Sequence, residues 1–223
     1  VDPLAHDGGT SMGLALLAAH EQGIKVKPYE NLYLGLKPKY PKLKANTSVD
    51  QIVKLLEENN VVAIYQGKQE AGPRALGNRS LLFNPTNPNA KDIVNKLKKR
   101  EWYRPYAGTI MKEHFKKYFN LPKKETPYMS YAAWVKRPAA LLGITHIDYT
   151  CRVQTLTEKQ NPNFYKLLKA WYKKTGCPVL LNTSLNIAGK PLVNSYDQVM
   201  EMLNTTELNY VYMPEINYLA KKK

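Results

Sequence analysis

The stretch GKQEAGPRALGNRS, residues 67–80, decides how the rest of the chain is interpreted. It lies between two apolar runs, VVAIY at residues 61–65 and LLF at residues 81–83. This pattern predicts a strand, a rigid polar loop and a second strand. The loop carries Arg74 and Arg79, and guanidinium groups bind phosphate or carboxylate oxygens through paired hydrogen bonds. Its glycines allow the backbone to approach a ligand closely, so the loop is predicted to bind an oxyanion or a phosphate.

The composition is that of a folded cytoplasmic protein. Of the 223 residues, 43% are hydrophobic, which is enough for a core, and 23% are charged. No apolar run approaches the roughly 20 residues that a membrane span needs, and the first residues do not form a signal peptide. Two cysteines, Cys151 and Cys177, are too few for a zinc site or a disulfide framework. We therefore expect a reducing, cytoplasmic location with no membrane partner.

The formal net charge of +15 indicates either an anionic partner or a lysine-rich solvated surface. Most of the excess lies in residues 25–44, 91–100, 112–124 and 221–223. No zinc-finger, bZIP or RNP1-like pattern is present, so a nucleic-acid partner is not expected. GxGxxG and the Walker A pattern are also absent, which argues against a dinucleotide site or a P-loop.

The first 23 residues, VDPLAHDGGTSMGLALLAAHEQG, predict a turn and then a helix capped by Thr10 or Ser11 and ended by Gly23. Asp7 stands just before this helix. Composition alone favours a turn or capping aspartate, and the functional alternative is a metal or phosphate contact. Residues 24–48 are predicted to connect this helix to the rest of the chain across the surface.

Two further polar segments carry arginine. In REWYRPYA, residues 100–107, Arg104 precedes proline and is biased towards an extended conformation. It suits a pocket wall, and it suits equally an arginine stacked on its neighbours for structural reasons. In HIDYTCRVQT, residues 146–155, a strand would place Arg152 on a polar face, which is either an exposed edge or the wall of a cleft.

The segment CPVLLNTSLN, residues 177–186, follows a predicted amphipathic helix at residues 161–175. Amides and hydroxyls directly after a buried strand are where α/β folds bind ligands. The alternative is a polar turn that caps its own backbone. Together, the alternating strands and helices predict an α/β (α+β) fold.

Four segments, GPRALGNRS, REWYRPYA, HIDYTCRVQT and CPVLLNTSLNIAGKPLV, occur in this order and resemble the C-terminal domain of the O-carbamoyltransferases that act on antibiotics and nodulation factors. The resemblance implies a YrdC-like twisted mixed sheet with flanking helices over residues 46–223. It also implies that residues 1–45 are the end of an upstream metal-binding transferase domain and a linker. Departures from the family include Lys190 where an acidic residue is usual and Tyr149 where glycine is usual.

The same resemblance implies the chemistry. The domain would bind carbamoyl phosphate and ATP with Mg²⁺, form carbamoyl adenylate, and supply it for transfer to a hydroxyl group of a small-molecule acceptor. The two phosphate substrates bring about six negative charges, which several fixed cations must balance. The predicted charge-stabilising residues are Arg74, Arg79, Arg104 and Arg152, and the predicted substrate-binding residues are Lys68, Glu70, Ser80, Asn182, Ser184 and Asn186.

Asp7 matches an aspartate that ligates iron in the family, so Fe²⁺ is expected in the upstream domain, whose chain would be a partner. Two alternatives remain at this point: a basic RNA-binding module and a non-catalytic YrdC-like module.

Overall fold

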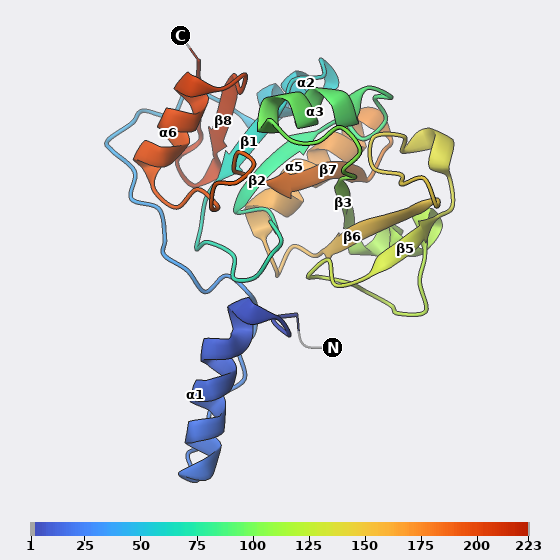
Figure 1. Cartoon of the computed structure of the whole chain (residues 1–223). Coiled ribbons are helices and arrows are strands. Elements are labelled where there is room, and N and C mark those ends of the chain that lie inside the picture. The colour runs from blue at the N-terminus through green and yellow to red at the C-terminus, as the bar shows by residue number, and fades with distance from the viewer. Residues whose placement is uncertain (1–2, 223) are drawn as a thin grey trace.

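A computed structural model describes residues 3–222, in which helices cover a mixed sheet of nine strands (Figure 1). The helices are α1 (Thr10–Glu21), α2 (Val49–Glu57), α3 (Ala90–Lys98), α4 (Phe115–Tyr118), α5 (Pro162–Thr175) and α6 (Tyr196–Thr205), with short 3₁₀ turns η1 (Asp7–Gly9), η2 (Lys112–His114), η3 (Pro138–Ala140) and η4 (Pro214–Ile216). The strands are β1 (Val62–Tyr65), β2 (Arg79–Phe83), β3 (Ala107–Met111), β4 (Phe119–Asn120), β5 (Ala132–Val135), β6 (Thr150–Leu156), β7 (Val179–Ser184), β8 (Tyr210–Met213) and β9 (Tyr218–Lys221).

The strand order β4-β5-β6-β3-β7-β2-β1-β8-β9 brings four strand ends to one edge of the sheet. Strand β7 runs antiparallel to β2 and β3, and β6 runs parallel to β3. The carboxyl end of β7 therefore lies beside the amino ends of β2, β3 and β6. This convergence places segments that are far apart in the sequence around one site.

The sheet is buried on both faces because alternate strand residues enter two different cores. On one face, Ile64 and Leu180 pack with α2 and α5. On the other face, Tyr65 and Leu181 pack in the cluster that includes residues of α3 and α6. Strands buried on both faces appear in sequence as continuous apolar runs, which is why residues 61–65 and 178–181 were recognisable.

Local signals place the helix ends as the sequence predicts. Ser48 accepts a hydrogen bond from the backbone N–H of Gln51 and completes a capping box at α2. Asn161 caps α5 in the same way, and Gly176 ends that helix in the left-handed conformation at φ 73°. The amphipathic helix predicted at residues 161–175 is therefore confirmed as α5, to within one residue.

Three boundaries differ from expectation. Strand β2 begins at Arg79, so this residue belongs to the sheet and not to the loop. The strand predicted from residue 146 begins only at Thr150, because residues 146–149 form a turn closed by a hydrogen bond from Tyr149 N to His146 O at 3.0 Å. Strand β9 was not predicted.

Helix α1 extends away from the sheet (Figure 1), and its leucines Leu14 and Leu17 are 62% and 53% exposed. Its amino-terminal cap is Gly9, without a side-chain hydrogen bond, so the predicted Thr10 or Ser11 cap was wrong. The division into residues 1–45 and 46–223 stays a prediction.

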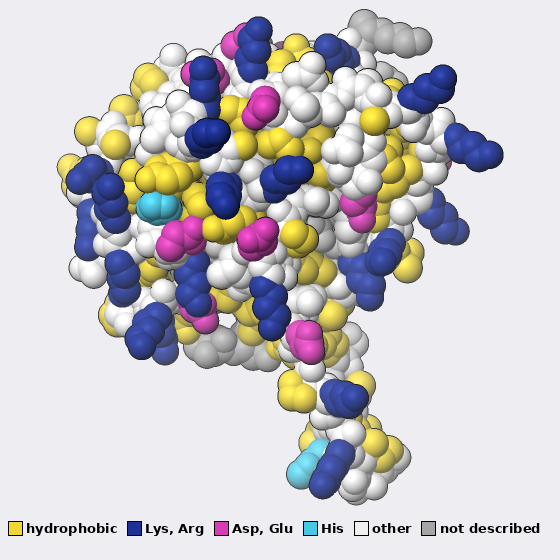
Figure 2. Space-filling model, turned by 180° about the vertical axis from the view of Figure 1, so that it is seen from behind, with side chains coloured by type: hydrophobic (Ala, Val, Ile, Leu, Met, Phe, Trp, Pro, Cys, Tyr) yellow, Lys and Arg dark blue, Asp and Glu magenta, His cyan; other side chains and the backbone are white. Residues whose placement is uncertain are grey.

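On the face shown in Figure 2, lysine and arginine side chains are dispersed among apolar and uncharged ones and form no continuous stripe. A dispersed pattern is that of a solvated lysine-rich surface. None of the helices within residues 3–222 combines the length and the apolar character that crossing a bilayer requires.

Candidate functional site

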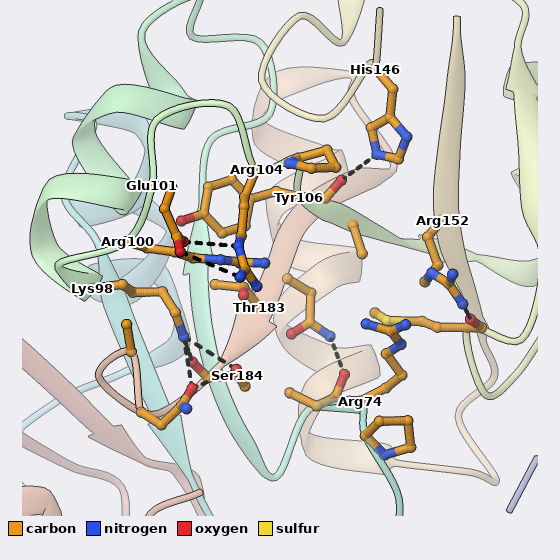
Figure 3. Close-up of a pocket in the computed structure, with 18 of the residues that line it drawn as sticks. Arg74, Lys98, Arg100, Glu101, Arg104, Tyr106, His146, Arg152, Thr183 and Ser184 are labelled. Atoms are coloured by element: carbon orange, nitrogen blue, oxygen red, sulfur yellow. Dashed lines mark hydrogen bonds and ion pairs between the residues drawn. The ribbon is translucent and has the colours of Figure 1, made fainter. Parts of the chain in front are cut away.

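A cavity of about 630 Å³ opens at the edge of the sheet where β7 ends and β3 begins (Figure 3). Its wall is strongly cationic, because five basic side chains face one carboxylate. The basic residues that line it are Arg74, Lys98, Arg100, Arg104 and Arg152, and the acidic residue is Glu101. Of the residues predicted from sequence, Arg74, Arg104, Arg152, Asn182, Ser184 and Asn186 all line this cavity.

Arg74 and Arg152 approach the cavity from the same side (Figure 3), although they come from the loop before β2 and from β6. Burial, and then the charges of Arg152 and Arg100, lower the pKa of Arg74. Arg152 is anchored by a hydrogen bond from Nη1 to the backbone oxygen of Met129 at 2.9 Å. Within residues 3–222 Arg74 forms no ion pair, so its guanidinium is available to an external anion.

Arg104 and Arg100 form the opposite wall. Arg104 makes an ion pair with Glu101, with Nε 2.8 Å from Oε2, and both side chains are about half exposed. Such exposed pairs contribute little free energy, so Arg104 can exchange Glu101 for a phosphate. The guanidinium of Arg100 lies over the ring of Tyr106, 5.4 Å from its centre, which fixes its position.

Lys98, the last residue of α3, is a site residue that sequence reasoning missed. Its side chain is buried, and Nζ donates to the backbone oxygen of Ser184, to Ser184 Oγ at 3.2 Å and to Asn186 Oδ1 at 2.8 Å. Burial, and to a lesser extent the charge of Arg100, lowers the pKa of Lys98 to about 7. The helical spacing contained the signal: positions 94, 97 and 98 follow the i, i+3, i+4 pattern of an inward face.

His146 also lines the cavity and was not among the predicted site residues. Its Nε2 atom lies 3.2 Å from the backbone oxygen of Tyr106. Burial lowers the pKa of the imidazole. Because a carbonyl oxygen only accepts, this contact places the proton of a neutral His146 on Nε2.

Glu70 lies outside the cavity and organises the loop from within. Its Oε1 atom accepts three backbone N–H groups, those of Leu76 at 2.9 Å, Asn78 at 2.7 Å and Arg79 at 3.1 Å. A group of converging backbone N–H donors is a typical anion site, and here the protein's own carboxylate fills it. The loop therefore presents Arg74 to the cavity, while its backbone N–H groups are occupied.

Arg79 is fully buried and does not line the cavity. Its Nη1 atom donates to the backbone oxygens of Gln66, of Gly67 at 3.2 Å and of Asn78 at 2.9 Å. The guanidinium lies 4.3 Å from the centre of the Tyr65 ring, and burial lowers its pKa. These contacts hold together the two ends of the loop.

The remaining predicted residues of the loop are also outside the cavity. Ser80 is buried and its Oγ accepts the backbone N–H of Gly77 at 3.0 Å. Lys68 lines a separate, more open cavity next to Asn161 at the start of α5. The structure thus separates Lys68, Glu70, Arg79 and Ser80 from the six predicted residues that meet in the cationic cavity.

Neither predicted metal has a set of protein ligands here. Asp7 is exposed in η1, and residues 3–222 contain no group of three or more histidine, cysteine or acidic side chains that could hold an ion. An iron site therefore does not fit these residues alone, and no step is assigned to iron. Mg²⁺ fits only as the companion of nucleotide phosphates, because the one carboxylate of the cavity, Glu101, already pairs with Arg104.

Residues 53–221 match the family described as "Carbamoyltransferase C-terminus". The chain belongs to this family. It is 34% identical over 251 residues to the nodulation protein NolNO of Sinorhizobium fredii, covering 100% of this chain and 36% of that protein. It is 41% identical over 145 residues to the 3'-hydroxymethylcephem-O-carbamoyltransferase of Amycolatopsis lactamdurans, covering 65% of this chain and 28% of that enzyme.

The chain thus spans about a third of the length of these two relatives. Among solved structures it resembles full-length HypF in the phosphate- and nucleotide-bound form, with a TM-score of 0.53 and 22% identity over 74% of this chain and 20% of that chain. This likeness concerns the fold, and the predicted YrdC-like α/β architecture is confirmed.

Proposed function

We propose that the cationic cavity binds carbamoyl phosphate and ATP and forms carbamoyl adenylate, which is then used to carbamoylate a hydroxyl group of a small-molecule acceptor. Membership of the carbamoyltransferase family supports the overall reaction. The observation that carries the finer assignment is the cluster of five basic side chains around one carboxylate in a cavity of about 630 Å³. The negative charges of phosphate substrates are best suited to balance the positive charge of such a cluster.

The chemistry divides into two steps. Hydrolysis of carbamoyl phosphate gives carbamate and inorganic phosphate. A carbamate oxygen then bonds to the α-phosphorus of ATP, while the bond from that phosphorus to the bridging oxygen of the β-phosphate breaks and pyrophosphate leaves. Phosphoryl transfers of this kind depend on positioning and charge stabilisation more than on covalent help from the protein.

The position of each basic residue in the cavity indicates which substrate it would bind. Arg74 and Arg152 share one side of the cavity and suit the phosphate of carbamoyl phosphate. Arg100 and Arg104 suit the phosphates of ATP on the opposite wall. Lys98 regains a full positive charge when a phosphate approaches, because a nearby anion raises the pKa of a lysine.

Exchange of label between pyrophosphate and ATP, measured with Mg²⁺ in the presence and absence of carbamoyl phosphate, tests the proposal. We expect exchange that depends on carbamoyl phosphate. The variant Arg74→Ala should lose it, whereas Arg137→Ala, which removes an exposed arginine outside this cavity, should retain it. A folded chain that catalyses no exchange, or an Arg74→Ala variant as active as Arg137→Ala, would contradict the proposal.

The chain spans 36% of NolNO and 28% of the cephem enzyme, so we propose that a further domain receives the carbamoyl group and holds the acceptor. Mixing the chain with such a domain and an alcohol substrate should then yield a carbamate ester, detectable by mass spectrometry.

A further inference from the structure

Asn182 on β7 holds an unusual position in the cavity wall. It lines the cavity, yet the whole residue is only 1% exposed. Its Nδ2 atom donates to the backbone oxygen of Ala75 at 3.2 Å, to Thr109 Oγ1 at 2.9 Å and to Gln154 Oε1 at 3.3 Å. Its Oδ1 atom is buried and accepts no hydrogen bond from any residue in the range 3–222.

The neighbouring network decides which way the amide of Asn182 points. Gln154 Nε2 donates to the backbone oxygen of Leu76 at 3.1 Å, which leaves Gln154 Oε1 to accept the hydroxyl of Thr109 at 2.9 Å. The oxygen of Thr109 is then free to accept from Asn182. Exchanging the two amide atoms of Asn182 would place Oδ1 against the backbone oxygen of Ala75, which only accepts. The orientation with Nδ2 towards Ala75 is therefore determined, and Oδ1 is the atom left over.

A buried acceptor without a partner is costly, and in native proteins it usually has a donor that the polypeptide does not provide. The location indicates which donor. Asn182 is bonded to Ala75, the residue after Arg74, so it lies next to the side of the cavity proposed to hold the phosphate of carbamoyl phosphate. The group attached to that phosphate is a carbonyl carbon bearing an amino group, and the amino group is a hydrogen-bond donor.

We propose that Asn182 Oδ1 accepts a hydrogen bond from the amino group of carbamoyl phosphate and thereby determines the specificity for a carbamoyl group. This inference rests on the proposed function. It distinguishes carbamoyl phosphate from acetyl phosphate, which has nearly the same shape and charge but carries a methyl group in place of the amino group. A site built around a hydrogen bond rejects an analogue that lacks the donor, because the buried acceptor stays unpaired.

The test compares the two acyl phosphates in binding to the intact chain, measured by calorimetry with each ligand. We expect the wild type to bind carbamoyl phosphate at least about tenfold more tightly than acetyl phosphate, a difference that one buried hydrogen bond can supply. In Asn182→Ala the affinity for carbamoyl phosphate should fall and the ratio should approach one. The control Asn204→Ala removes an exposed asparagine outside the cavity and should leave the ratio unchanged.

Each other result has a defined meaning. Equal binding of both ligands by the wild type, or an equal loss of both in a folded Asn182→Ala, would overturn the inference while leaving the proposed function standing. Binding of neither ligand by the wild type would overturn the proposed function, and the inference with it. Asn182→Ala could instead keep its preference for carbamoyl over acetyl phosphate and lose a preference for ATP over ITP. That result would assign Oδ1 to the adenine amino group and overturn the inference.

Asn182→Ala also removes the hydrogen bonds that Nδ2 donates to Ala75, Thr109 and Gln154, so its folding must be checked by thermal unfolding. Asn182→Ser supplies a second variant that retains a smaller polar group. If it folds, it too should show a reduced ratio of carbamoyl to acetyl phosphate affinity, and an undiminished ratio would overturn the inference.

Discussion

The carboxylate of Glu70 and the backbone of Asn78 are joined by a hydrogen bond of 2.7 Å from Asn78 N to Glu70 Oε1. Two further N–H groups, from Leu76 and Arg79, meet the same oxygen. The backbone N–H groups of the glycine-rich loop thus surround a carboxylate, but this carboxylate is a side chain of the loop itself and not the external anion that the sequence predicts. Arg74, which the filled loop holds at the cavity, is the loop residue left for the proposed external ligand.

Replacing Glu70 should therefore destabilise the fold. In Glu70→Ala three buried N–H groups lose their acceptor, so we expect the free energy of unfolding to fall by about 3 kcal/mol or more. Glu70→Gln keeps an oxygen acceptor and should cost about 1–2 kcal/mol. Urea denaturation measures both, with Glu158→Ala, an exposed glutamate, as the control. A loss in Glu70→Ala no larger than in that control would show that the loop holds its shape without the carboxylate.

The two arginines of the loop should behave differently. Arg79→Ala removes a fully buried side chain and its bonds to three backbone oxygens, and we expect a loss of about 3 kcal/mol or more in stability. Arg74→Ala should change stability by no more than about 0.5 kcal/mol, because Arg74 forms no ion pair within residues 3–222. It should weaken phosphate binding at least about tenfold, since a charge-assisted contact is lost.

Denaturation and phosphate titration of both variants measure these effects. If Arg79→Ala were as stable as the wild type while losing phosphate affinity, Arg79 would have to reach the ligand directly, as the sequence first suggested.

Phosphate binding should take up a proton through Lys98. Its pKa of about 7 leaves the amine mostly neutral at about pH 8, and a bound phosphate raises that pKa and recharges it. Affinity should therefore fall as the pH rises from about 7 towards the ordinary lysine value of 10.5. Calorimetry at about pH 8 in buffers of different ionisation enthalpy counts the protons, with Lys98→Met as the control that should take up none. Identical heats in all buffers for the wild type would contradict a neutral Lys98.

The same shift affects folding. In the unfolded chain Lys98 is protonated below about pH 10.5, whereas in the folded chain it is protonated only below about pH 7. Between these values the unfolded state holds more protons, so stability should rise with pH. In Lys98→Met this part of the pH dependence of unfolding should disappear.

The capping box of α2 gives a stability prediction away from the site. Ser48→Ala removes the acceptor for the Gln51 N–H and should cost about 1 kcal/mol. Thr10→Ala at the start of α1 is the matched control, because no side chain caps that helix. Thermal unfolding of the two variants compares them directly, and an equal effect would mean that the α2 cap contributes nothing.

Local features of the fold followed from the sequence because they depend on neighbours along the chain. Buried strands are continuous apolar runs, helices repeat at 3.6 residues, and Asn161 and Gly176 mark the ends of α5. The family resemblance followed from four ordered segments. Strand β9 was not predicted because its residues, Tyr218–Lys221, end in lysine, and only pairing with β8 makes them a strand.

At residues 67–80, too, some features of the site followed from the sequence and others only from the tertiary structure. The sequence by itself determined that a polar turn carrying arginine joins two apolar strands here. Only the tertiary structure decided that Arg79 faces inwards, that Glu70 fills the loop, and that Lys98 joins Ser184 across the cavity. The physical reason is that burial and charge pairing depend on which strands lie side by side. Here the order of β6, β3, β7 and β2 brings the carboxyl end of β7 to the same edge of the sheet as the amino ends of the other three strands.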